Sequence, residues 1–129
     1  MGAGGVGDAI AKIADRRSFL ETIIVGDYDV SRAEHTIAWI ADEHGADQAG
    51  VGARFVAAQI DASDASAVER VAREHRATHV MNAVEPKFVP TIFAGALAAG
   101  ADYLDMAMSL SHPRPDRPYS ETGVKLGDE

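Results

Sequence analysis

Three glycines at the start of the chain have a spacing that suits phosphate binding. Residues 2–7 read Gly-Ala-Gly-Gly-Val-Gly, so Gly2, Gly4 and Gly7 form a Gly-x-Gly-x-x-Gly pattern. In such a pattern the first glycine permits a tight turn, the second lets backbone approach a pyrophosphate, and the third lets a helix pack closely on a sheet. The helix that follows would offer unpaired amides and a partial positive charge. The pattern predicts a dinucleotide site, with a flexible glycine-rich tail as the alternative.

A carboxylate follows at the distance that this pattern requires. Asp27 lies twenty positions after Gly7, at the end of the apolar run 22–26. Such an acid accepts hydrogen bonds from the adenosine ribose hydroxyls, with a solvated turn acid as the alternative. A 2′-phosphate there would repel it by roughly 4 kcal/mol per charge pair, at about 4 Å and an effective dielectric of about 20. Asp27 therefore favours NAD over NADP, although Arg32, one turn later, could reach a 2′-phosphate.

The remaining candidates follow later apolar runs. Asp61 comes after the run 54–60, where it would lie near the adenine or serve equally well in the turn before the next helix. Asn82 lies in the run 79–84, and ligands of open α/β sheets bind at the carboxyl ends of strands. Asn82 could therefore contact the cofactor, with bonding to loop backbone as the alternative. The cofactor-binding candidates are Gly2, Gly4, Gly5, Val6, Gly7, Asp27, Arg32, Asp61, Ala62, Asn82 and Ala83.

The elements that must position these residues alternate between helix and strand. Ser31 and Glu34 have the spacing of a capping box, which places the start of one helix at Ser31. Apolar, β-branched runs predict strands, and helical spacing of apolar residues predicts helices between them. The alternation is typical of an α/β fold with a Rossmann-like, doubly wound parallel sheet. Strands are expected at 22–26, 54–60, 79–84 and 101–107, and helices at 5–17, at 31–45, after 63–64 and at 86–100.

Both ends of this pattern look incomplete. A strand normally precedes the glycine turn, and the sequence has only Met1 there, so the first strand is expected to be missing. In the order 3-2-1-4-5 that strand is central, and each backbone group left unpaired would cost about 1–3 kcal/mol. The chain alone is therefore expected to be unstable or to rely on another chain. Residues 1–107 are expected to form the incomplete dinucleotide-binding domain, and 108–129 an irregular connector toward an absent second domain.

Composition narrows the classes of function. The net charge of -8 argues against a nucleic-acid surface, and no apolar run approaches the roughly 20 residues of a membrane span. The chain has no cysteine, which excludes thiolate metal sites and a cysteine nucleophile, and its histidines show no metal-ligand spacing. No signal-peptide pattern is present at the start, so a cytoplasmic location is expected.

Taken in order, these motifs resemble the NAD(P)-binding N-terminal domain of the saccharopine dehydrogenase family. The resemblance implies an oxidoreductase that moves a hydride between nicotinamide and the CH–NH bond of an amino-acid-derived secondary amine or imine. It also implies that a second domain binds the small-molecule substrate and carries the acid/base group, so catalytic residues stay unassigned. A homo-oligomer is compatible with this interpretation. The matching stretches are residues 2–7, 25–29 with Arg32, 59–64, 82–86 and 101–105.

Two alternatives stay open at this point. One is a non-catalytic nucleotide-binding module, which would sense redox state or serve as a partner subunit. The other is a Rossmann-like fold that binds no nucleotide. The family's substrates vary among its members, so the resemblance does not select one substrate.

Overall fold

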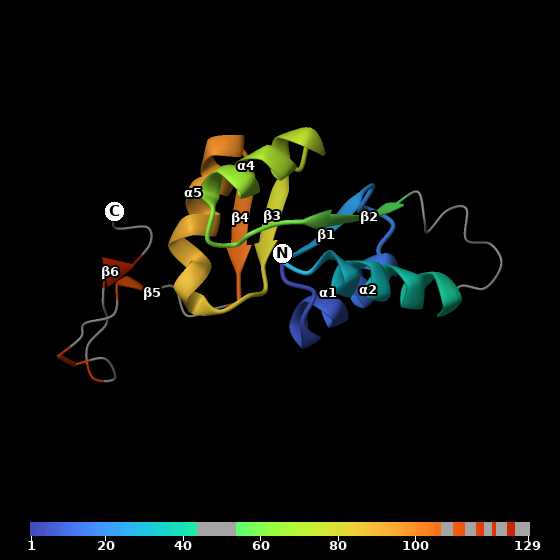
Figure 1. Cartoon of the computed structure of the whole chain (residues 1–129), viewed down its shortest axis with the longest axis horizontal. Helices are drawn as coiled ribbons and strands as arrows, with labels where there is room; N and C mark the ends of the chain where they lie inside the picture. The colour runs from blue at the N-terminus through green and yellow to red at the C-terminus, as the bar shows by residue number, and fades with distance from the viewer. Residues whose placement is uncertain (44–53, 107–109, 113–115, 118–119, 121–123, 126–129) are drawn as a thin grey trace.

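The computed structural model describes residues 1–43, 54–106, 110–112, 116–117, 120 and 124–125. Helices and parallel strands alternate along the chain, which confirms the predicted α/β fold (Figure 1). In chain order the elements are α1 Gly5–Asp15, β1 Ile23–Asp27, α2 Val30–Glu43, β2 Phe55–Gln59, α4 Ala65–Glu74, β3 His79–Asn82, the 3-10 turn η1 Pro86–Phe88, α5 Val89–Ala99, β4 Asp102–Asp105, β5 Leu110–His112 and β6 Val124–Lys125.

Within the described ranges, the strands of the α/β region form two parallel pairs. β1 pairs with β2, and β3 pairs with β4, so the neighbours expected from the order 3-2-1-4-5 are found. The register runs from Ile23 opposite Phe55 in the first pair and from His79 opposite Asp102 in the second. The inner edges of the two pairs are β1 and β3.

The first two residues of the chain connect these inner edges. The Gly2 amide donates to the Gly26 carbonyl at 2.7 Å, which ties the segment to β1. On the other side, the Met1 amino group donates to the Met81 carbonyl at 2.6 Å, and the Ala83 amide donates to the Met1 carbonyl at 2.9 Å. The glycine turn therefore starts between the carboxyl ends of β1 and β3. The instability expected of this arrangement stays a prediction.

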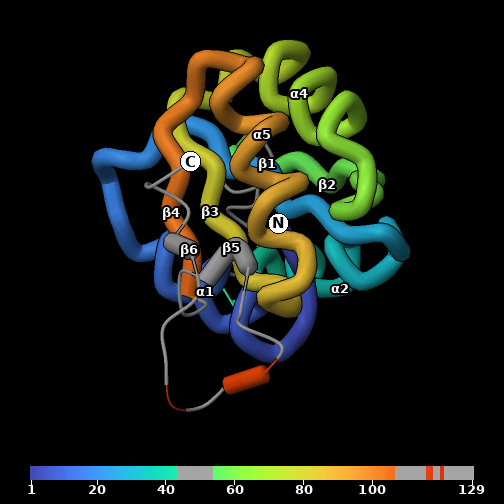
Figure 2. The backbone as a smooth tube through the Cα atoms, turned by 90° about the vertical axis from the view of Figure 1, so that its left-hand side faces the viewer, coloured from blue at the N-terminus to red at the C-terminus, as the bar shows by residue number. Residues whose placement is uncertain are grey.

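The described residues form two hydrophobic cores. Helices α1 and α2 pack together near β1 and β2, while α4 and α5 pack together near β3 and β4 (Figures 1 and 2). Ile40 and Phe55 are buried in the first core. Val68, Val80 and Ile92 are buried in the second. Strands β1 and β2 contribute to both cores, because Val25 and Phe55 lie in the first while Ile24 and Ala58 pack against the second. At the start of the chain, Met1 packs against the second core and Ala3 lies in the first.

Two of the observed helix ends agree with the ends predicted from the sequence, and one differs. Asp64 accepts a hydrogen bond from the Ser66 amide at 2.9 Å and caps α4, and Gly100 ends α5 with a φ of +75°. The expectation that Ser31 starts α2 is wrong, because α2 begins at Val30. The Asp29 carboxylate accepts from the Ser31 amide at 3.1 Å, which is the bonding of an N-cap two residues earlier.

The segment expected to be an irregular connector contains a short antiparallel pair. Leu110 lies opposite Lys125, and His112 lies opposite Val124. The other expectations for residues 107–109, 113–115, 118–119, 121–123 and 126–129 lie outside the described residues. Among the described helices, none has the length and apolar character needed to cross a membrane.

Arg54 fastens the chain after α1 to the start of β2. Its guanidinium donates to three carbonyl oxygens, those of Asp15 at 3.2 Å, Arg17 at 2.9 Å and Leu20 at 3.0 Å. The Arg54 Nε atom is buried and has no hydrogen-bond partner among the described residues. The terminal nitrogens therefore donate to the last carbonyl of α1, which lacks an intrahelical donor, and to two carbonyls of the loop that follows.

Replacing Arg54 with alanine is expected to lower the free energy of unfolding by about 2–4 kcal/mol. Hydrogen bonds to charged groups contribute about 1.5–3 kcal/mol each, and partial exposure reduces their sum. Urea denaturation measures the loss. Arg70→Ala is the matched control, because Arg70 lies 3.6 Å from Glu74 with both side chains more than 60% exposed. Such a pair contributes less than about 1 kcal/mol. Equal losses in the two variants would contradict the role given to Arg54.

Candidate dinucleotide site

The turn of residues 2–7 leaves no space for side chains at its first and last glycine. Gly2 has a φ of +88°, in the left-handed region, and an added Cβ would lie 2.6 Å from Val84 Cγ1. A Cβ on Gly7 would lie only 1.6 Å from the Gly2 carbonyl oxygen. Both positions therefore require glycine: Gly2 for the tight turn that the pattern predicts, and Gly7 because α1 starts directly against the backbone of Gly2.

The middle of the turn is open instead. Outside its own helix and its neighbours, a Cβ on Gly5 would meet no atom within 4 Å, and one on Gly4 would meet only Arg32 Nη2 at 3.6 Å. The amides in the first turn of a helix lack acceptors within the helix, and the N-cap residue of α1, Gly4, has no side chain that could accept from them. A phosphate can therefore approach these amides directly at the positive end of the helix dipole.

Asp27 holds the glycine turn from the end of β1. Its Oδ2 atom accepts a hydrogen bond from the Ala3 amide at 2.7 Å, and its Oδ1 atom accepts from the Asp29 amide at 3.1 Å. These bonds place the carboxylate beside the turn and compensate part of its charge. Each carboxylate oxygen can accept a second hydrogen bond, so the position still suits a ribose hydroxyl.

A pocket of ≈ 550 Å³ lies next to the turn, between the first turns of α1 and α2. Its walls combine open backbone with cationic side chains from both helices. The lining residues are Ala3, Gly4, Gly5, Asp8, Lys12, Ser31, Arg32, His35 and Thr36. The pocket therefore joins the predicted phosphate-binding turn to Arg32, which the sequence singled out as a possible partner for a 2′-phosphate.

The negative charge of Asp8, the acidic residue of this pocket, is compensated by neighbouring side chains. Lys12 Nζ lies 2.7 Å from Asp8 Oδ2, and the Thr36 hydroxyl donates to Asp8 Oδ1 at 2.8 Å. Burial acts to raise the pKa of Asp8, but the hydrogen bonds from Lys12 and Thr36 outweigh it and hold that pKa below its usual value. Lys12 is thus engaged within the protein. Arg32 forms no ion pair in the part of the chain that the structure describes, so it is a cation of the lining that a phosphate can reach.

The structure places the later candidates away from this pocket's lining. Asp61 accepts from the Ser63 amide at 2.8 Å and from the Ser63 hydroxyl at 2.6 Å, and both bonds lower the pKa of Asp61. This is the turn role that the sequence left open, and Ala62 packs against the second core. Asn82 is buried, and the Ala83 amide is bonded to Met1. The turn, Asp27 and Arg32 come together, whereas Asp61 is bonded within its own turn.

Sequence reasoning missed the contributions of Lys12 and Thr36 to the pocket. The spacing of Asp8 and Lys12, four residues apart in a helix, was a visible signal for an ion pair. Thr36 lies in α2, and only the packing of α2 on α1 brings its hydroxyl to Asp8. No pattern within one element could have indicated that contact.

A comparison with known families agrees with this geometry. The model of the saccharopine dehydrogenase NADP binding domain matches residues 1–129. The chain belongs to the saccharopine dehydrogenase family. The match confirms the resemblance seen in the sequence, and it identifies an NADP-binding domain of an oxidoreductase family. The preference for NAD inferred from Asp27 is not supported by it. No curated protein matches the chain.

Proposed function

We propose that this domain of the saccharopine dehydrogenase family holds NADP(H) for an oxidoreductase acting on the CH–NH bond of an amino-acid-derived secondary amine or imine. The nicotinamide supplies the hydride chemistry when it is bound, and the residues of this chain bind and orient the cofactor. The observation that carries the proposal is the uncapped first turn of α1, open at Gly4 and Gly5 and anchored to Asp27 through Ala3.

The turn provides the part of the site that takes the pyrophosphate. Because Gly5 and Gly4 have space where a side chain would lie, the diphosphate can reach the backbone amides without displacing protein atoms. These amides are already oriented by α1 before the ligand arrives, which lowers the cost of ordering on binding. The bond from Ala3 to Asp27 keeps the turn next to the ribose position.

The choice of NADP over NAD follows from Arg32 in this proposal. Its guanidinium lies 3.6 Å from the position of a Cβ on Gly4, on the wall of the same pocket. Asp27 would repel a 2′-phosphate, but its charge is already shared with two backbone amides. A guanidinium binds phosphate through strong, charge-assisted hydrogen bonds. We expect this attraction to exceed the repulsion from Asp27.

Replacing Arg32 with alanine is expected to weaken NADPH binding by about tenfold to a hundredfold and to leave NADH binding nearly unchanged. A hydrogen bond to a charged group contributes about 1.5–3 kcal/mol, and about 1.4 kcal/mol corresponds to a factor of ten. Fluorescence titration with both cofactors measures the ratio. Arg32→Lys is the control that keeps the charge and should retain part of the NADPH affinity. Equal losses for both cofactors would contradict the assignment, and no binding of either cofactor to the unaltered protein would overturn the proposed function.

The substrate class rests on the family resemblance, and its test is separate. Protein that contains this domain would be supplied with NADP⁺ and secondary amines derived from amino acids, and nicotinamide reduction would be followed by absorbance. Turnover of such amines supports the class. Cofactor binding without turnover of any CH–NH compound favours the non-catalytic nucleotide-binding module.

A further inference from the structure

The Asn82 side chain is buried at the end of β3 and is bonded at both ends of its amide. It is 1% exposed, its Nδ2 donates to the Tyr103 hydroxyl at 2.9 Å, and its Oδ1 accepts from the Val84 amide at 2.9 Å. An amide so deeply buried is costly unless its polar atoms are paired. The two bonds join β4 to the loop that follows β3.

That loop lies against the first glycine of the dinucleotide turn. An added Cβ on Gly2 would be 2.6 Å from Val84 Cγ1 and 3.0 Å from the Ala83 carbonyl oxygen. The Ala83 amide also donates to the Met1 carbonyl at 2.9 Å. The loop therefore contacts Gly2 closely enough to set where the turn begins.

The ring of Tyr103, whose hydroxyl accepts from Asn82, packs against α5. Its ring meets the Phe93 ring edge-on, with centroids 5.5 Å apart and planes at 80°. Burial raises the pKa of Tyr103 to about 12, and the neighbouring Asp105 adds to this despite the bond from Asn82. The hydroxyl thus stays protonated at neutral pH. A line of contacts runs from α5 through Tyr103, Asn82 and Val84 to Gly2.

We propose that Asn82 and Tyr103 are positioning residues of the dinucleotide site, which fix the glycine turn through the loop of Ala83 and Val84. The proposal rests on the proposed function and deepens it. Asn82 then acts on the cofactor through the turn and without touching the cofactor itself. The second strand pair, which contributes no residue to the pocket lining, determines where the phosphate-binding amides lie.

Replacing Tyr103 with phenylalanine tests the proposal with the smallest change. The ring still packs against Phe93, and Asn82 loses one partner. We expect the dissociation constant for NADPH to rise about threefold to tenfold, which corresponds to one hydrogen bond. The dissociation constant for 2′-AMP should stay the same, because this ligand lacks the pyrophosphate and depends on Asp27 and Arg32. Equal weakening for both ligands would overturn the proposal.

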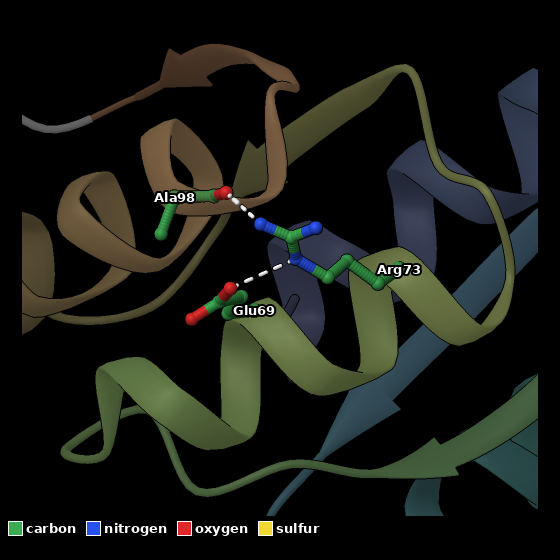
Figure 3. Close-up of polar contacts among 3 residues, drawn as sticks. All are labelled: Glu69, Arg73 and Ala98. Atoms are coloured by element: carbon green, nitrogen blue, oxygen red, sulfur yellow. Dashed lines mark hydrogen bonds and ion pairs between the residues drawn. The ribbon is translucent and has the colours of Figure 1, made fainter.

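Arg73→Ala is the matched control for a merely structural effect. Arg73 joins α4 to α5 by donating to the Ala98 carbonyl at 2.6 Å and to Glu69 at 2.8 Å (Figure 3). Its loss should lower the melting temperature while the affinity for NADPH, measured well below that temperature, stays unchanged. A loss of NADPH affinity in Arg73→Ala as large as in Tyr103→Phe would assign the effect to general destabilisation.

A measurement without ligand separates this proposal from the proposed function. The amide resonances of residues 2–7 should shift, and their hydrogen exchange should speed up, in Tyr103→Phe and not in Arg73→Ala. Unchanged resonances in Tyr103→Phe would overturn the positioning role even if NADPH binds. If the unaltered protein binds no dinucleotide, the proposed function fails, and the resonances still decide whether Asn82 and Tyr103 position the turn.

Discussion

Replacing Gly7 with alanine is expected to abolish dinucleotide binding and to destabilise the protein. The new Cβ would lie 1.6 Å from the Gly2 carbonyl oxygen, a backbone atom that cannot rotate away. Either α1 or the turn must move, and the phosphate-binding amides move with them. Overpacking of this kind costs about 1–3 kcal/mol and more when backbone is displaced. NADPH titration and thermal denaturation measure the two effects.

Gly5→Ala is the matched control for this prediction. Apart from its own helix and neighbouring residues, a Cβ at Gly5 would meet no atom within 4 Å, and alanine favours a helix over glycine by about 1 kcal/mol. Its melting temperature should therefore equal or exceed that of the unaltered protein. Two outcomes would contradict the steric argument: a Gly7→Ala variant that binds NADPH normally, or one that melts as the Gly5→Ala variant does.

Replacing Gly95 with alanine is expected to cost about 2 kcal/mol of stability, although alanine is the better helix former. A Cβ at Gly95 would lie 2.6 Å from the Ala65 carbonyl oxygen and 2.6 Å from Val68 Cβ, so α5 would have to move away from α4. Strain of about 3 kcal/mol then opposes a helix-propensity gain of about 1 kcal/mol. Urea denaturation measures the difference.

The control for Gly95 lies on the same helix. Leu97 is 67% exposed, so Leu97→Ala should change the stability by less than about 0.5 kcal/mol. A Gly95→Ala variant as stable as the unaltered protein would show that α4 and α5 can separate without cost. Such a result would also question the close packing that holds the second core together.

Patterns confined to one element predicted the fold well. The glycine spacing placed Gly2 and Gly7 at positions where a side chain does not fit, and Gly100 ends α5 as expected. The misplaced start of α2 shows the limit of such patterns. Asp29 and Ser31 are both suitable caps, and the bond between the Asp29 amide and Asp27 helps to fix the backbone there. Local sequence could not choose between two caps so close together.

Contacts between elements were beyond prediction from the sequence. The inference from Asp27 to NAD weighed its ribose hydrogen bonds and its charge against Arg32, but its bonds to Ala3 and Asp29 depend on the folded turn and could not be included. The pairing of Asn82 with Tyr103 joins residues of two strands, and only their parallel register brings the side chains together. The sequence could indicate which residue types were present, but not which of them would already be hydrogen-bonded within the protein.

The short segment of Met1 and Gly2 is hydrogen-bonded to β1 on one side and to β3 and the residue after it on the other. A cofactor bound to the glycine turn would therefore lie where the two strand pairs adjoin. Any movement of one strand pair against the other would displace the backbone amides that bind its phosphates. Cofactor binding is therefore expected to restrain the two strand pairs against each other and to make this domain more rigid.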